Sequence, residues 1–304
     1  MKEERFSFSK VDTFNQCPFK YLLKYVEGHY PKGSSIALEF GTAIHSCEES
    51  IANSIKDGTP IEYISNKNAL LKKMYELEHK YPDDFYALDK SGRTYKQKTF
   101  EYLEKGIYRL KDFIDKHPQL EIVGAEVAIN FRFADKYLFR GSIDRLLRNK
   151  ETGEYIIHDV KTYNKPLEHD HLTTPLQFVV YAMAVAEMYR CDISKVTCAY
   201  DLPLCDVIQD AGTAGWIKRG TDKLNKLFAG IEAKEFEPKP TALCHWCDFC
   251  LTNDNADKDC KFLCPYFCKW TKENKVFCKE NEWQGAEAHP LVLEHFKQVH
   301  GLAK

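Results

Sequence analysis

The sequence contains no long apolar run, no apolar N-terminal segment and no excess of positive charge. No stretch approaches the ~20 apolar residues of a membrane-spanning helix, which excludes a helical membrane protein. The N-terminal stretch MKEERFSFSK lacks the apolar core of a secretory signal, so we expect a cytoplasmic protein. The formal net charge is −2, so any contact with nucleic acid would have to rely on a local basic groove.

Apolar residues and cysteine, in contrast, are plentiful. Hydrophobic residues make up 44% of the 304 positions, enough to fill the core of one large domain, alone or with an appendage. Most of the 12 cysteines lie between residues 244 and 278, shortly after KEFEPKPTAL, whose two prolines mark a boundary. We therefore expect a main domain over 1–240 and a cysteine-rich segment over 241–304.

In a reducing compartment, such a cysteine cluster favours metal ligation over disulfides. Its members are Cys244, Cys247, Cys250, Cys260, Cys264, Cys268 and Cys278. The first two have the C-x2-C spacing that closes readily around a metal or a cluster.

A second metal site at the end of the chain is the weaker of two interpretations. It would use Cys264, Cys268, His295 and His300, but 26 residues separate Cys268 from His295, against about 12 in a zinc finger. A C-terminal helix that packs through apolar side chains is favoured instead. Those side chains are Leu291, Leu293 and Phe296.

The hydrophobic pattern predicts the order of the elements. Helices are expected over 10–26 (capped by Ser9 and ending at Gly28), 37–56, 66–80, 95–117, 174–189 and 212–230. Strands are expected over 121–133, 136–148, 154–162 and 195–202. Helices, then a strand meander, then helix–strand–helix predict a mixed α/β fold.

The segment FRGSIDRLLRNKETGEYIIHDVKT carries the strongest functional signal. It predicts two strands joined by a turn, with Asp144 on the first strand and Asp159 and Lys161 at the end of the second. Side chains two residues apart on a strand share a face, and the hairpin can bring Asp144 alongside. Acid–lysine pairs on strands usually mark only a solvated face. Here the IIHDV strand is apolar and expected to be buried, so its charges need a partner or a divalent cation.

Three further features line up with this hairpin. His45 in FGTAIHSCEES lies on the second helix, where a lone histidine is more often structural. Gln177 and Tyr181 are four residues apart and share one helix face, either as core-edge polar residues or as part of a site. Glu126, on the preceding strand, could extend the acidic group.

Taken in order, these motifs resemble the PD-(D/E)XK nuclease superfamily, and most closely its RecB-like branch. The segments are SFSKVDTFNQCPFKYLLKYVEG, GTAIH, GSIDRL, HDVKT and a helix with Q-x3-Y. The branch includes AddB-type helicase–nucleases, CRISPR-associated RecB-like exonucleases and single-domain phage nucleases. The resemblance implies a restriction-endonuclease-like core, in which helices flank a central mixed sheet.

The resemblance also implies roles for the site residues. Asp144 and Asp159 would hold Mg²⁺ or Mn²⁺, with His45 as a further ligand and the Val160 carbonyl completing the shell. Lys161 would position the attacking water and stabilise charge on the phosphate. The two α-helical polar residues, Gln177 and Tyr181, would contact DNA and order the site.

Some members of the branch carry an iron–sulfur cluster, and the resemblance extends to its ligands. Cys17, Cys244 and Cys247 would hold a [4Fe–4S] cluster, with zinc as the alternative metal. The fourth ligand departs from the family pattern, since the usual spacing ends at Asn253. Cys264 is favoured because a proline follows it, and Cys260 and Cys250 are the alternatives.

The resemblance thus implies a metal-dependent DNA nuclease, acting as an exonuclease or on DNA ends in recombination, repair or phage DNA metabolism. Its substrate would be single-stranded DNA or duplex ends. An inactive DNA-binding scaffold and a structure-specific endonuclease are the alternatives. The chain has no G-x4-G-K-[ST] motif, so ATP-driven unwinding would require a helicase or recombination partner.

Overall fold

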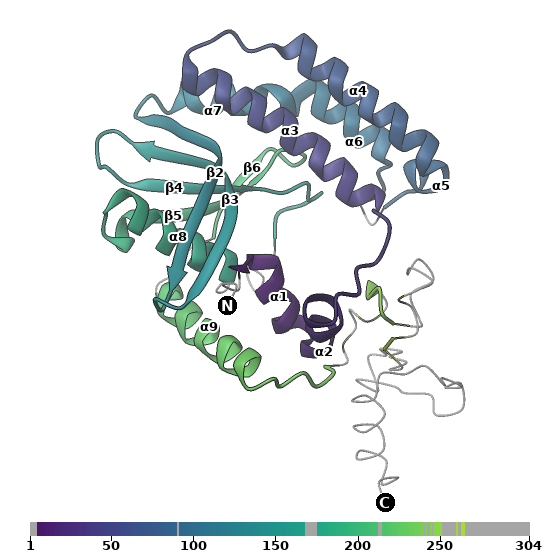
Figure 1. The fold of residues 1–304 in the computed structure, drawn as a ribbon. Coiled ribbons are helices and arrows are strands. Elements are labelled where there is room, and N and C mark those ends of the chain that lie inside the picture. The colour runs from purple at the N-terminus through teal and green to yellow at the C-terminus, as the bar shows by residue number, and fades with distance from the viewer. Residues whose placement is uncertain are drawn as a thin grey trace, which may run out of the picture. The chain divides into compact units, whose positions relative to one another are not determined.

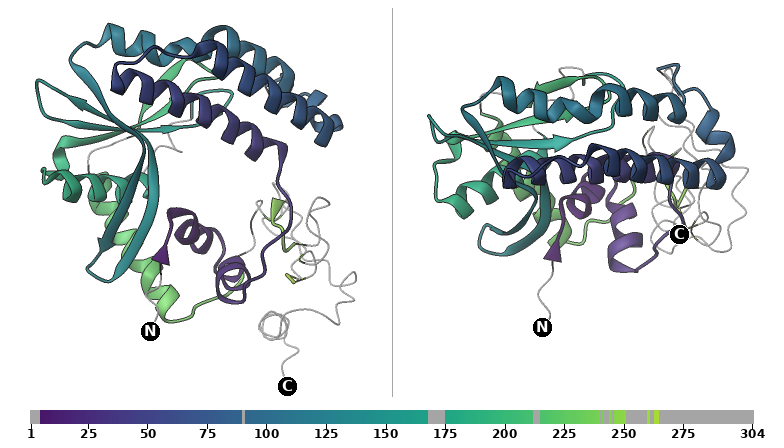
Figure 2. Two further views of the ribbon diagram at one scale, coloured as in Figure 1. Left: turned by 45° about the horizontal axis from the view of Figure 1, so that its top comes forward. Right: turned by 90° about the horizontal axis from the view of Figure 1, so that it is seen from above.

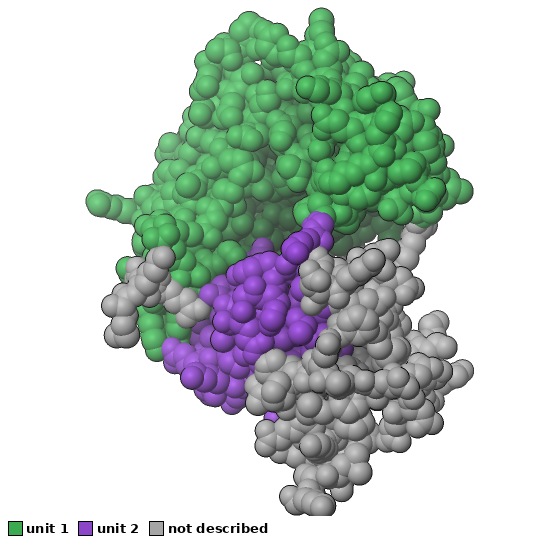
Figure 3. Space-filling view, turned by 45° about the vertical axis from the view of Figure 1, so that its right-hand side comes forward, with its two compact units in different colours: residues 1–8, 34–221 green, residues 9–33, 222–304 purple. Residues whose placement is uncertain are grey.

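The computed structural model describes residues 5–89, 91–167, 175–211, 215–239, 241, 244, 246–250, 260, 263 and 264. Among these, no helix combines the length and the apolar character needed to cross a membrane. The chain packs into two compact units (Figure 3). One contains residues 1–8 and 34–221, and the other contains 9–33 and 222–304. The division expected at residue 240 remains a prediction.

The larger unit is built on a mixed sheet centred on β3 (Figure 1). Its strands are β1 (Arg5–Phe6), β2 (Leu120–Phe133), β3 (Tyr137–Asn149), β4 (Tyr155–Val160), β5 (Val196–Leu202) and β6 (Val207–Asp210). Along one edge, β3 pairs antiparallel with β2 over its whole length. Along the other it pairs with β1 at residues 138–139 and with β4 at residues 145–148. β4 and β5 are parallel, and β6 is antiparallel to β5.

Helices cover both faces of this sheet (Figures 1 and 2). One side carries α3 (Ile36–Asp57), α4 (Tyr63–Lys80), α5 (Pro82–Tyr86), α6 (Tyr95–Glu101) and α7 (Ile107–Lys116). A π-helical segment, Tyr102–Gly106, joins α6 to α7. The other side carries α8 (Leu176–Tyr189), whose buried residues include Leu176, Phe178 and Val180. This arrangement confirms the predicted mixed α/β fold with a central mixed sheet.

The sequence of α3, a helix that reaches the site, explains where this helix begins and ends. The Ser35 hydroxyl accepts a hydrogen bond from the Leu38 N–H and caps its start. Gly58, with φ of +66°, ends it in the left-handed conformation that glycine adopts without steric cost. Between these ends, Ile44 and Ile51 are fully buried and fix the helix against the core.

The smaller unit contains α1 (Phe8–Gln16), α2 (Pro18–Tyr21), a π-helical segment (Leu22–Val26) and most of α9 (Trp216–Glu232). The single helix expected over 10–26 is wrong, because the chain breaks at Cys17. The residue before a proline is driven out of the helical region, and Cys17 has φ −156° and ψ 110°. Its sulfur therefore lies at a helix junction and not within a regular helix.

Four short elements were not expected from the sequence: β1, α5, β6 and a 3-10 helix at Ile193–Lys195. Each has five residues or fewer, too short for a clear hydrophobic period. The predicted C-terminal helix with Leu291, Leu293 and Phe296 lies outside the described residues. So do Cys268, Cys278, His295 and His300.

Candidate active site

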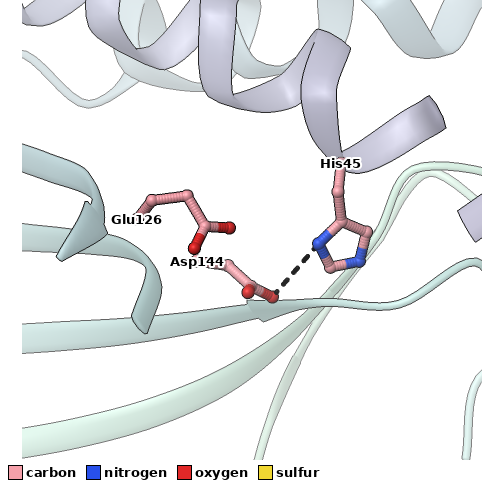
Figure 4. A group of neighbouring side chains, drawn as sticks. All are labelled: His45, Glu126 and Asp144. Atoms are coloured by element: carbon pink, nitrogen blue, oxygen red, sulfur yellow. Dashed lines mark ion pairs between the residues drawn. The ribbon is translucent and has the colours of Figure 1, made fainter. Parts of the chain in front are cut away.

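His45, Glu126 and Asp144 come from three elements and meet at one point. They lie on α3, β2 and β3, and one ligand atom of each lies within 4.8 Å of the others (Figure 4). His45 Nδ1 is 3.7 Å from Asp144 Oδ2. One imidazole nitrogen and two carboxylates at this spacing form a donor set that a single divalent cation can bridge.

Glu126 reaches this point where β2 is distorted. The ladder between β2 and β3 shifts register between Ile122 and Gly124, and Glu126 itself has φ of +47°. Residues other than glycine seldom occupy this left-handed region, which costs about 1–3 kcal/mol and is typical of functional sites. The Ser142 hydroxyl donates a hydrogen bond to the Glu126 carboxylate and holds it in place.

Asp159 is held by Lys161, which directly follows β4, and by a polar group of α8. Lys161 Nζ lies 2.6 Å from Asp159 Oδ2. Gln177 Nε2 donates to Asp159 Oδ1 at 3.0 Å and to Tyr181 Oη at 3.1 Å. The pair predicted to share one face of this helix therefore does so, with Gln177 as the member that touches the acid.

A backbone amide connects the two acids of the hairpin. The Val160 N–H donates to Asp144 Oδ2 at 2.7 Å, just beyond the last paired residues of β3 and β4, Arg145 and His158. Continuing that register places Asp144 opposite Asp159, so both carboxylates share one face. The ligand role expected for the Val160 carbonyl stays a prediction.

Burial and neighbouring charges determine the protonation of this site. Burial first, and then the charge of Asp159, raise the pKa of Asp144 to about 6, although His45 and Lys161 oppose the rise. Burial alone would lower the pKa of Lys161, but the two acids outweigh it and raise that pKa, so the ammonium remains charged. Burial raises the pKa of Tyr181 to about 12, which keeps the phenol protonated.

The residues present fit a hard divalent cation. Asp159 Oδ2 is buried and forms the ion pair with Lys161. That single ammonium group faces two carboxylates, Asp144 and Asp159, so a bound cation would offset the remaining negative charge. Carboxylate oxygens with one imidazole suit Mg²⁺ or Mn²⁺. Asp144, Asp159, His45 and Glu126 are the side chains that could hold it.

Directly behind the site lies a second, fully buried ionic network. Arg145 is 1% exposed and contacts two carboxylates: its Nη2 lies 2.7 Å from Glu48, and its Nη1 donates to Asp201. Arg109 of α7 donates to the other oxygen of Asp201. The His158 ring packs beside them, with Nδ1 3.8 Å from Asp201 Oδ2, beyond hydrogen-bonding distance. Two guanidinium groups thus balance two carboxylates.

Sequence reasoning missed this network. Its members are Glu48, Arg109, Arg145, His158 and Asp201. A signal was present, because the charged residue of GSIDRLL that follows Asp144 stands among apolar strand residues and so had to be buried with a partner. The identity of that partner could not be read locally, since Arg145 and Glu48 are 97 residues apart.

In the smaller unit, five cysteines line one narrow cavity. They are Cys17, Cys244, Cys247, Cys250 and Cys264. The Lys239 and Thr241 N–H groups donate to the sulfurs of Cys17 and Cys244, each at 3.4 Å. Cys260 is not among the lining residues and belongs to the apolar cluster of Phe19, Leu23 and Phe249, against which four of these cysteines also pack.

Comparison with known proteins identifies the family of this chain. A crystal structure of a "putative exonuclease" from Eubacterium rectale is similar at 14% identity and a TM-score of 0.46, covering 80% of this chain and 87% of that one. Similarity at this level carries no argument about activity. No curated protein matches. A model of the PD-(D/E)XK nuclease superfamily matches residues 5–250, most of the sequence. The chain therefore belongs to the PD-(D/E)XK nuclease superfamily.

Proposed function

We propose that this chain is a divalent-metal-dependent DNA nuclease of the RecB-like branch that acts as an exonuclease or on DNA ends. The convergence of Asp144, Asp159 and Lys161 with His45 on one side of the sheet carries this proposal. A scaffold that had lost activity would be expected to lack at least one of these groups. A helicase or recombination partner would supply any ATP-driven unwinding.

Each residue of the site would have a separate role in phosphodiester hydrolysis. A bound divalent cation would lower the pKa of the attacking water and neutralise charge on the phosphate. Lys161, charged and anchored on Asp159, would sit against a phosphate oxygen or the water. Gln177 fixes the orientation of Asp159 through its amide, and Tyr181 receives the second hydrogen bond of that amide. His45 and Glu126 would bind the cation beside Asp144.

End-labelled linear and circular DNA, single- and double-stranded, would test the proposal with Mg²⁺, Mn²⁺ or EDTA. We expect cleavage of linear DNA that EDTA abolishes and that Asp159→Asn lacks. Cleavage of circular DNA would favour the endonuclease alternative. DNA binding without cleavage under every metal condition would favour the scaffold alternative.

His45 can be tested through metal use. His45→Ala should raise the Mn²⁺ concentration required for half-maximal rate by about 10- to 100-fold, as expected for the loss of a metal ligand or its support. An unchanged metal titration would make His45 a structural residue.

We further propose that Cys17, Cys244, Cys247 and Cys264 hold a [4Fe–4S] cluster. Their shared cavity and the backbone N–H groups on two of the sulfurs support the proposal, because such hydrogen bonds stabilise thiolates that ligate iron. Cys250 lines the same cavity and is the main alternative as fourth ligand. Cys260 is the weaker alternative, because it is not among the residues that line this cavity.

Protein purified without oxygen should be brown and contain about four iron atoms per chain. Cys17→Ser should remove the colour and lower the melting temperature. Among the Cys264→Ser, Cys250→Ser and Cys260→Ser variants, only the first should lose iron. Colourless protein with stoichiometric zinc would support the zinc alternative.

A further inference from the structure

The outer half of the β2–β3 pair extends beyond the rest of the sheet as a two-stranded arm. β4 pairs with β3 only at residues 145–148, whereas the β2–β3 ladder continues to Phe133 and Tyr137. β1 covers the second edge of β3 only at residues 138–139. Residues 140–144 therefore pair with β2 alone. Figures 1 and 2 show the two long strands running past the sheet.

The two faces of this arm differ in character. Ile129, Phe131 and Phe139 point to one face and are buried. The opposite face presents the cross-strand pairs Asn130–Arg140 and Ala128–Ser142, in which Ser142 is half-buried and the other three residues are exposed. Burial of the apolar face stabilises the arm. The fold does not require an arginine on the opposite, polar face.

This polar face leads directly into the metal-binding trio. Ser142 and Asp144 have the same parity as Arg140 along β3, so their side chains follow one another on one face. The contact of Ser142 with Glu126 shows that this face reaches the acids. Four residues of strand place Arg140 about 13 Å from Asp144.

Arg140 differs from the other arginines of this strand. Arg145 is buried between two carboxylates, and Arg148 lies 3.6 Å from Glu121. Arg140 is exposed, and the described part of the chain offers it no carboxylate partner. An exposed guanidinium with five donors and no acid beside it is suited to an external phosphate.

We propose that the polar face of the β2–β3 arm is a track for the phosphate backbone of the DNA strand being cut. Arg140 binds a phosphate removed from the scissile one, with Asn130 beside it, and Ser142 lines the path between the two phosphates. The inference rests on the proposed nuclease function and adds that the substrate must be long enough to reach Arg140. The separation of 13 Å corresponds to about four nucleotides of duplex rise, fewer in an extended strand, so very short oligonucleotides should be poor substrates.

A matched pair of charge-removing variants tests the track. Arg140→Gln should lower kcat/KM for DNA by about 10-fold or more, and the slope of log kcat/KM against log salt should become shallower by about 0.7–0.9. Arg148→Gln removes the same charge from the same strand and should leave both quantities unchanged. Melting temperatures of both variants confirm that they fold.

Substrates with one neutral methylphosphonate linkage, moved stepwise from the cleaved bond, locate the contact. In the wild type, one position two to four linkages away should lower kcat/KM as Arg140→Gln does, and the two changes together should cost no more than either alone. Arg140→Gln with wild-type kinetics, or fully additive losses at every position, would overturn the track while leaving the nuclease intact. A wild-type chain that neither binds nor cuts DNA would overturn both.

Discussion

Two ionic clusters lie back to back in this fold and are built from neighbouring residues. Asp144 and Asp159 belong to the open cluster, and Arg145 and His158, adjacent to them in sequence, belong to the buried network. In the open cluster the acids outnumber the lysine, and the pKa of Asp144 is raised to about 6. In the buried network every carboxylate faces a guanidinium.

The comparison shows that the charge partners of a carboxylate, more than its residue type, determine whether it stabilises the fold or favours binding of a cation. Burial by itself raises the pKa of Asp201, but His158, Arg145 and Arg109 around it outweigh burial and lower that pKa well below its ordinary value. Such a group stabilises the fold. Asp144 has no comparable neutralising partner and favours a cation from solution. Substitutions in the two clusters should therefore have opposite effects on activity and stability.

The largest effect is expected for Asp159→Asn. Loss of this carboxylate removes several kcal/mol of transition-state stabilisation, about three orders of magnitude in the cleavage rate. The melting temperature in EDTA should change little, because the lost repulsion between Asp159 and Asp144 offsets the lost ion pair with Lys161. Rates on end-labelled DNA check this expectation, with Asp210→Asn, at the exposed last residue of β6, as the control. Wild-type cleavage by Asp159→Asn would refute the assignment of the site.

The buried network should respond in the opposite way. Asp201→Asn leaves two guanidinium groups without their carboxylate and should lower the free energy of unfolding by about 3–5 kcal/mol. Denaturant unfolding measures the loss. Asp206→Asn is the control, because Asp206 also pairs with Arg109, at 2.9 Å, but is 87% exposed. Asp206→Asn should lower the free energy of unfolding by less than about 1 kcal/mol. Equal decreases in the two variants would contradict the distinction between the two clusters.

A smaller effect should appear in the pH dependence of the metal-free protein. The pKa of Asp144 rises from 3.8 to about 6 on folding, so its contribution to stability is complete below pH 3.8 and is lost as the pH rises through 6. Asp144→Asn should remove this loss and be more stable than the wild type above pH 7 in EDTA, by about 1–3 kcal/mol. Unfolding at several pH values tests the sign.

Added Mg²⁺ provides the control for that measurement. It should stabilise the wild type, because it binds the folded state, and should stabilise Asp144→Asn much less. If both proteins lost stability equally between pH 4 and 7, another group would be responsible.

The smallest effect is expected for Tyr181→Phe. This change removes the acceptor of the second Gln177 hydrogen bond, whose net contribution is about 0.5–1.5 kcal/mol. kcat/KM should fall roughly 2- to 12-fold, mainly through DNA binding. Tyr189→Phe at the far end of α8 is the control. A loss as large as that of Asp159→Asn would place Tyr181 in the chemical step.

The parts of the site that lie close together in the sequence could be predicted, because one hairpin and one helix turn bring their side chains together. Strand alternation and the short turn of the hairpin place Asp144, Asp159 and Lys161 together, and helix spacing pairs Gln177 with Tyr181. The fold class followed from the order of helices and strands. The proline after Cys17 also indicates the helix break. The apolar period of the flanking residues continues across that proline and predicts one uninterrupted helix instead.

The long-range partners could not be predicted in the same way. Arg109 reaches Asp201 across 92 residues, and no local pattern specifies which buried acid will meet which arginine. The turn of Glu126 into the site depends on a register shift and a left-handed backbone at a residue that is not glycine. Both features result from packing of the whole sheet.

The adjacency of the two clusters has a consequence for how β4 may align with β3. A slip of one residue would exchange the faces of His158 and Asp159. The imidazole would then turn toward the open side, and a carboxylate would enter an interior already balanced in charge. The buried ion pairs therefore favour the native register, and the same register places Asp144 and Asp159 together on the opposite face of the hairpin.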